Sequence, residues 1–169
     1  MGKEERSGGM IKLYHGGVKE IKKPFAKIGR RNLDFGPGFY LTRRLQQAKD
    51  WAMKTGRQQM ERPVVNEFAF DLESVMEKCR YKNFEHYDSE WLDFIVRCRQ
   101  GYDPSEMYDC IEGGVANDRV IDTVEGYING TIDQQHALKE LSKHQPNNQV
   151  CILNQEVINE YLTFINIVD

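Results

Sequence analysis

The sequence predicts an α+β fold, because stretches with the period-two pattern of strands and stretches with helical spacing are interspersed along it. They do not follow the regular strand–helix–strand rhythm of a doubly wound sheet. The chain has 169 residues, of which 40% are hydrophobic and 29% charged, as is typical of one globular domain. We therefore expect a single domain over residues 10–169, preceded by a flexible leader at residues 1–9.

Short strands separated by a basic loop are predicted near the N-terminus, followed by one helix. Alternation favours a strand over Ile11–His15, and the lysine-rich stretch Lys19–Asp34 is typical of a loop. A Gly-Pro-Gly turn leads into a second strand, Phe39–Thr42. Helical spacing then predicts a helix over Arg43–Thr55 that ends at Gly56.

The rest of the chain continues the mixed order of strands and helices. The predicted elements are a strand over Val64–Asp71, a helix opened by Asp88-Ser89 and ended at Gly101, a strand over Met107–Glu112, a helix opened by Asn117-Asp118, a helix following Thr131, a strand over Gln149–Leu153, a short helix around Val157 and Tyr161, and a final strand over Leu162–Val168.

Composition and missing motifs exclude several classes of protein. The formal net charge is -3, whereas proteins that coat nucleic acid are usually basic, so any contact with nucleic acid must be a local patch. No apolar run approaches the roughly 18 residues of a membrane span, and no stretch resembles a signal peptide, so we expect a cytoplasmic protein without membrane contact. The four cysteines lack C-x-x-C spacing, which favours reduced core thiols and no metal site. Motifs of the common dinucleotide, NTPase, hydrolase and metalloprotease sites are also missing.

Two segments carry residues suited to ligand binding. Leu13-Tyr14-His15-Gly16-Gly17 places a histidine at a strand end before two glycines, whose backbone a ligand can approach closely. The second segment, Asp34–Thr42, is a glycine turn that leads into aromatic residues. Taken alone, each segment could have a purely structural role. The first would be a histidine with its hydrogen bonds satisfied before a glycine turn, and the second a hairpin that enters the core. Their combination favours a shared site.

The two segments together resemble the poly(ADP-ribose) polymerase branch of the ADP-ribosyltransferases. Phe35-Gly36-Pro37-Gly38-Phe39-Tyr40-Leu41 resembles its Phe-Gly-x-Gly-Ile-Tyr-Phe stretch, and Tyr14-His15-Gly16 resembles its His-Gly motif. In that branch a stacking aromatic residue follows the motif tyrosine by eleven positions, which here is Trp51.

The whole domain is also similar to a bacterial family of small ADP-ribosyltransferase-like proteins of uncharacterised function. The segments that carry this similarity are Gly29–Thr42 and Val115-Ala116-Asn117-Asp118-Arg119. The resemblance implies a split two-sheet β core with flanking helices and an NAD cleft. It also implies a toxin–antitoxin or phage-defence context, with an antitoxin protein as a partner.

The resemblance assigns the catalytic triad to His15, Tyr40 and Gln149, where the family pattern has His, Tyr and Glu. It implies that nicotinamide leaves NAD through an oxocarbenium-like state, with His15 on the adenosine-side ribose and the Gly16 backbone on the nicotinamide amide. Tyr40 and Trp51 would sandwich the nicotinamide ring. The residues expected to bind NAD are Tyr14, His15, Gly16, Arg30, Asn32, Gly38, Phe39, Tyr40 and Trp51.

Three functions remain open at this point. The first is a mono-ADP-ribosyltransferase that modifies a protein or nucleic acid, and the second is an inactive module that binds NAD or ADP-ribose. The neutral amide of Gln149 favours the second, because it supplies no charge. The third is an RNA-directed phosphotransferase on a related scaffold. The arginines that flank the turn are suited to the NAD pyrophosphate, to an anionic acceptor or to a solvated surface: Arg30, Arg31, Arg43 and Arg44.

Overall fold

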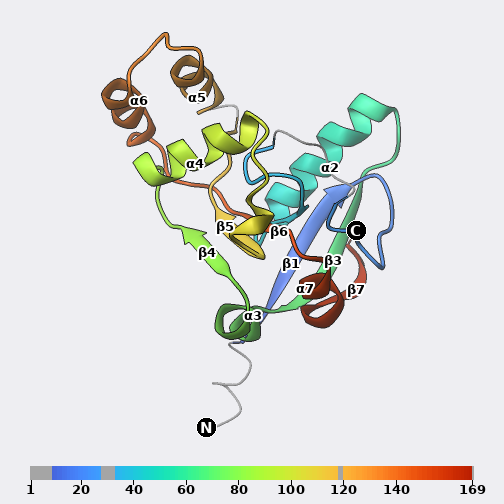
Figure 1. Cartoon of the computed structure of the whole chain (residues 1–169). Coiled ribbons are helices and arrows are strands. Elements are labelled where there is room, and N and C mark those ends of the chain that lie inside the picture. The colour runs from blue at the N-terminus through green and yellow to red at the C-terminus, as the bar shows by residue number, and fades with distance from the viewer. Residues whose placement is uncertain (1–8, 28–32, 118–119, 169) are drawn as a thin grey trace, which may run out of the picture.

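Two β-sheets form the centre of the computed structural model, which describes residues 9–27, 33–117 and 120–168 (Figure 1). Sheet A is antiparallel in the order β1-β3-β7, and sheet B has the order β2-β6-β5-β4 with only β4 and β5 parallel. The strands are β1 (Met10–Gly17), β2 (Phe39–Leu41), β3 (Val64–Asp71), β4 (Tyr81–Phe84), β5 (Cys110–Gly113), β6 (Gln149–Ile152) and β7 (Leu162–Val168). This arrangement confirms the predicted α+β class.

Helices cover the outer faces and the ends of the two sheets (Figure 1). They are α2 (Leu45–Gln59), α3 (Leu72–Lys78), α4 (Ser89–Arg99), the 3₁₀ turn η1 (Pro104–Glu106), α5 (Ile121–Ile128), α6 (Gln134–Leu141) and α7 (Gln155–Tyr161). Helix α2 packs against β1 and β3, and α3 packs against α7. In the described part of the chain, no helix has the length and apolar character that crossing a membrane requires.

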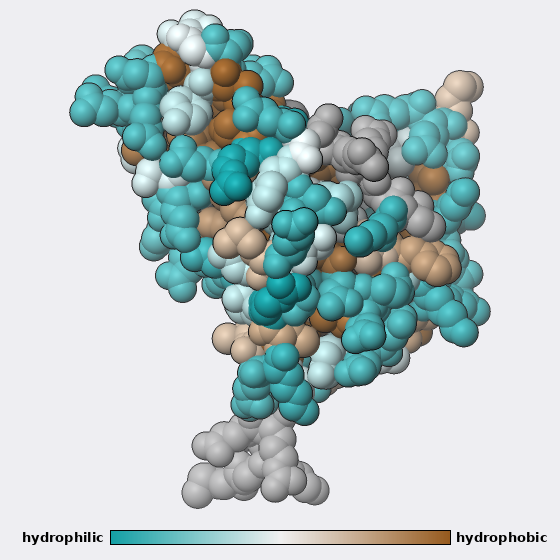
Figure 2. Space-filling view, viewed as in Figure 1, coloured by the Kyte–Doolittle hydropathy of each residue, from teal (hydrophilic) through white to brown (hydrophobic). Residues whose placement is uncertain are grey.

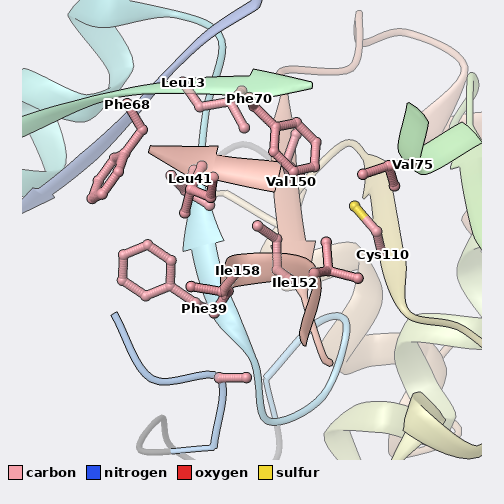
Figure 3. Packing of buried hydrophobic residues seen from close by; sticks show 13 residues of the cluster. Leu13, Phe39, Leu41, Phe68, Phe70, Val75, Cys110, Val150, Ile152 and Ile158 are labelled. Atoms are coloured by element: carbon pink, nitrogen blue, oxygen red, sulfur yellow. The ribbon is translucent and has the colours of Figure 1, made fainter. Parts of the chain in front are cut away.

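The main hydrophobic core lies between the two sheets, as Figure 3 shows. Sheet A contributes Leu13, Phe68 and Phe70, and sheet B contributes Phe39 and Leu41 among others. These residues alternate along their strands with residues of the other face, because successive side chains of a strand point to opposite sides. The alternation therefore fixes which face of β2 meets sheet A.

A second core fills the space between sheet B and helices α4, α5 and α6. Trp91 is fully buried there, and its indole Nε1 donates a 2.8 Å hydrogen bond to the Gly114 carbonyl. Cys98 and Cys151 are buried in the same core, and Cys110 lies in the core between the sheets, as their apolar surroundings predict. On the face shown in Figure 2, hydrophilic residues predominate and hydrophobic ones show at the end formed by α5 and α6.

Several predicted boundaries are wrong, and three of them have a clear local reason. Strand β1 continues through both glycines to Gly17, which pairs with Val64. Helix α2 passes Gly56, whose missing Cβ lets the Glu61 carbonyl approach to 2.7 Å of the Cβ position. Strand β5 begins at Cys110 and not at Met107, because the amides of Met107 and Tyr108 both donate to the Pro104 carbonyl in a turn.

Helix α3 and strand β4 have no counterpart among the predicted elements. Helix α3 has seven residues, which is too short for a helical period to stand out, although the Asp71 carboxylate caps it at the Ser74 amide. Strand β4 has four residues and pairs only with β5. Both elements are therefore stabilised mainly by tertiary packing.

Candidate functional site

Strands β1 and β2 meet at one residue pair and then separate. Tyr14 and Thr42 exchange two backbone hydrogen bonds of 2.8 and 2.9 Å, and this bridge is isolated. Continued antiparallel pairing would bring Gly16 opposite Tyr40. Instead the His15 ring reaches the Tyr40 carbonyl, with Nδ1 at 2.7 Å from the oxygen. A histidine side chain therefore stands where the next backbone pair would form.

This contact orients the His15 ring. A carbonyl oxygen only accepts hydrogen bonds, so Nδ1 carries a proton, and Nε2 is an acceptor whenever the ring is neutral. The ring also stacks on Phe39, with centroids 4.6 Å apart and planes inclined by 23°. Burial lowers the pKa of His15, although the hydrogen bond to the Tyr40 carbonyl opposes this effect. The site thus presents a fixed acceptor nitrogen at neutral pH.

The backbone amide and carbonyl of Gly16 point toward β2 but do not pair with it. Tyr14 directs its amide and carbonyl to β2, and hydrogen-bonding direction alternates along a strand, so Gly16 directs its own pair to the same side. In the part of the chain that the structure describes, no hydrogen bond reaches either group from β2. A Cβ on Gly16 would lie 2.0 Å from the Ala48 carbonyl oxygen, so close packing of α2 requires glycine here. Trp51 lies half-buried on that same turn of α2.

Tyr40 anchors the glycine turn that precedes it. Its hydroxyl donates to the Gly36 carbonyl and accepts a 3.1 Å hydrogen bond from the Phe35 amide. Burial raises the pKa of Tyr40, so the phenol stays protonated. Among the described residues, the aromatic rings in contact do not include the pair of Tyr40 and Trp51.

Gln149 shares a face of sheet B with Tyr40. Tyr40 pairs with Cys151 across β2 and β6, and Gln149 lies two residues earlier on β6, so both side chains point to the same side. Gln149 is only 5% exposed, yet its Nε2 has no hydrogen-bond partner among the described residues. Buried amide groups are nearly always paired, because an unmade bond costs about 1–3 kcal/mol. The unpaired NH₂ therefore marks a place for a polar partner.

Glu112 organises the entry to β6, and sequence reasoning gave it no role. Its carboxylate accepts hydrogen bonds from Arg43 (2.6 and 2.8 Å), Tyr81 (2.6 Å) and Asn148 (2.8 Å). Burial alone would raise the pKa of Glu112, but these bonds outweigh it and hold the pKa below its ordinary value. The charged carboxylate thereby fixes Asn148, the neighbour of Gln149. An acidic residue within an apolar strand was the available signal.

A family model described as "Protein of unknown function (DUF3990)" matches residues 11–164. The chain belongs to the DUF3990 family. No characterised protein and no solved structure matched it. The family description states no reaction, so the chemistry of this DUF3990 chain rests on its own residues.

The motif glycines of the DUF3990 chain serve its packing. Gly36 has φ 84°, a conformation that favours glycine, and Gly38 lies where a Cβ would meet the Cys151 sulfur at 2.5 Å. Asp34 orders the same loop, since its buried carboxylate accepts bonds from Arg99 (2.7 Å) and from the Ala116 amide (2.8 Å). These contacts hold Phe39 and Tyr40 in place.

An open, polar cavity of about 400 Å³ lies beside the start of β6 in this DUF3990 chain. Arginine, glutamate and amide side chains predominate in its lining, which consists of Arg43, Arg44, Asn83, Phe84, Glu85, Glu112, Gly113 and residues 145–148. Within the described residues, no group of three His, Cys, Asp or Glu side chains could hold a metal ion.

The structure brings together five of the ten residues expected at the site of this DUF3990 chain. Tyr14, His15, Gly16, Phe39 and Tyr40 gather at the point where β1 and β2 separate. The side chains of His15 and Tyr40 lie on opposite faces of their strands, and the His15 ring contacts the backbone carbonyl of Tyr40. The Gln149 side chain lies on the same face of sheet B as that of Tyr40. The expected residues Arg30 and Asn32, together with Asp118 and Arg119, lie outside the described residues.

Proposed function

We propose that the chain is a mono-ADP-ribosyltransferase that uses NAD as its donor. The observation that carries this proposal is the separation of β1 and β2 after the Tyr14–Thr42 bridge. It leaves the amide and carbonyl of Gly16 without a backbone partner on β2, at a strand edge that His15 borders. A primary carboxamide, such as that of nicotinamide, requires one donor and one acceptor on its partner, and a free strand edge supplies both.

His15 suits the sugar side of the donor. Its Nε2 is an acceptor as long as the ring is neutral, and a ribose hydroxyl is a donor. Stacking on Phe39 and the bond to the Tyr40 carbonyl fix the ring before any ligand arrives. A preorganised group loses little entropy when it binds, so this arrangement supports tight recognition of a ribose.

Gln149 suits the second ribose contact, close to the bond that would break. Its buried Nε2 has no partner in residues 9–27, 33–117 and 120–168, and a hydroxyl oxygen would satisfy it. Departure of nicotinamide from an NAD ribose develops positive charge on the sugar, as in glycoside hydrolysis. A neutral amide orients the sugar but supplies no opposing charge, so we expect slow turnover.

The same amide supports a second candidate, a module that binds NAD or ADP-ribose without turnover. Both candidates would bind NAD, but only the transferase would release nicotinamide from it. Purified protein should therefore be incubated with NAD in the presence of cell lysate as acceptor, with nicotinamide measured by chromatography and NAD affinity by calorimetry.

Three variants sharpen this experiment. His15→Ala removes the fixed acceptor, and Gln149→Ala removes the buried amide, whereas His136→Ala changes an exposed histidine on α6 as a matched control. Transferase activity predicts release in the native chain and in His136→Ala, with a loss in the other two. Binding without release would support the module. Absence of NAD binding in the folded native chain would refute both.

A further inference from the structure

The segment that follows β1 carries a concentrated positive charge. Lys19–Lys27 contains four lysines and one glutamate, although the whole chain has a net charge of -3. Within the described chain, Lys22 is the one lysine of this segment with an ion pair, at 3.6 Å from Glu20 and with both side chains exposed. No ion pair involving Lys23 or Lys27 is found among the described residues.

Two side-chain amides hold the backbone of this segment in one conformation. Asn66 is fully buried, and it accepts from the Ile21 amide (2.8 Å) and donates to the Lys19 carbonyl (2.9 Å). Gln155 accepts from the Ala26 amide (2.8 Å) and donates to the Pro24 carbonyl (3.1 Å). The backbone of the segment is therefore held in place by hydrogen bonds to β3 and to α7.

Around the tether to Gln155, buried and exposed residues alternate. Pro24 and Ala26 are buried, whereas Lys23, Phe25 and Lys27 are exposed. Phe25 is 61% exposed, which places an aromatic ring in water between two lysines of the sequence. A rigid backbone thus presents a ring and two flanking cations outward.

We propose that the Lys19–Lys27 segment binds single-stranded nucleic acid, with a base stacked on Phe25 and neighbouring phosphates on Lys23 and Lys27. Aromatic rings combined with basic side chains are the means by which proteins bind single strands of any sequence. A duplex keeps its bases stacked on one another, so a surface ring gains little from it. An acidic peptide would pair with the lysines but has no flat base to cover the ring.

The segment also lies close to the candidate site. Asn66, which tethers it, pairs with His15 across β1 and β3, and the segment continues directly from β1 (Figure 1). A strand bound here would be brought to that site. In that respect only, the inference rests on the proposed function and names nucleic acid as the acceptor. The binding itself does not depend on NAD.

Fluorescence anisotropy with labelled oligouridine and oligothymidine of about 12 nucleotides tests the proposal in the absence of NAD. We expect both single strands to bind more tightly than a duplex of equal length. Phe25→Ala should weaken binding roughly tenfold, and Phe25→Trp should retain it. The double variant Lys23→Gln/Lys27→Gln should reduce the slope of log affinity against log salt by about 1.4, from two phosphates at about 0.7 each.

Matched controls separate specific contacts from general effects. Met76→Ala removes another exposed hydrophobic side chain, and Lys78→Gln/Lys139→Gln removes the same charge elsewhere. The proposal is overturned if Phe25→Ala binds like Met76→Ala, if the duplex binds as well as the single strands, or if polyglutamate competes as well as an oligonucleotide. Binding without nicotinamide release would refute the proposed reaction alone.

Discussion

Replacing Glu112 with glutamine tests whether one buried carboxylate holds the candidate site together. Each oxygen of this carboxylate accepts two hydrogen bonds: Oε1 from Arg43 Nη2 and the Tyr81 hydroxyl, Oε2 from Arg43 Nε and Asn148 Nδ2. A glutamine places an NH₂ group where one oxygen was. If that NH₂ replaces Oε1, the Tyr81 hydroxyl can turn and accept from it, but Arg43 Nη2 loses its acceptor, and the two bonds to the remaining oxygen lose the charge of the carboxylate.

The expected cost follows from one lost bond and two weakened ones. Hydrogen bonds to a charged group contribute about 1.5–3 kcal/mol each and neutral ones about 0.5–1.5 kcal/mol, which gives about 3–6 kcal/mol in total. The Arg43 side chain is 40% exposed, so water replaces part of its loss. We therefore expect Glu112→Gln to lower the free energy of unfolding by about 2–4 kcal/mol at neutral pH.

Urea denaturation of both proteins measures this difference, with Glu90→Gln as the control because Glu90 is 63% exposed in its pair with Lys82. The lowered pKa of Glu112 determines how its contribution to the free energy of unfolding changes with pH. Its contribution is present above the unfolded-state value of about 4.3 and is lost as the pH falls through the lower folded-state value. A neutral-pH difference below about 0.5 kcal/mol, or one that persists unchanged in acid, would refute the reasoning.

Further substitutions address the other parts of the site. Gln149→Glu supplies charge where it would develop, so we expect nicotinamide release from NAD to rise by about tenfold or more; an unchanged rate would contradict the proposed role. Gly16→Ala should destabilise the chain by about 1–3 kcal/mol in urea, because its Cβ would lie 2.0 Å from a carbonyl of α2. Gly17→Ala, whose Cβ would meet only the His15 ring at 3.5 Å, should change stability by less than about 1 kcal/mol, and equal effects would disprove the packing argument. In an NMR titration the ring of His15 should protonate below the ordinary pKa of about 6.5, because it is buried; NAD binding should weaken only below that pH, and a value above 6.5 would exclude the neutral ring.

Elements with a strong local pattern were predictable to the residue. Strands β3 and β7 have the predicted bounds, Val64–Asp71 and Leu162–Val168, and in β3 the alternation of the sequence is itself the cause of the one-sided burial. The cap of α4 at Asp88 was predictable for a similar reason, since a carboxylate that accepts from the Trp91 amide lies in the same segment as that amide.

The candidate site was predictable only in its list of residues. The sequence indicated His15, Tyr40, Trp51 and Gln149, but not that His15 and Tyr40 meet through a backbone carbonyl. It gave Gly16 a ligand-facing role, and the structure adds the close approach of α2 as a separate reason for glycine there.

The sequence by itself determined which segments alternate and which side chains face the cores, because these depend on neighbours along the chain. Only the tertiary structure decided that β1 and β2 part after a single bridge, that Glu112 gathers donors from separate elements, and that Gln149 Nε2 is buried with no partner in the described part of the chain. Each of these depends on groups far apart in sequence. Their distances are set by how the two sheets pack, and a pattern within one segment carries no information about that packing.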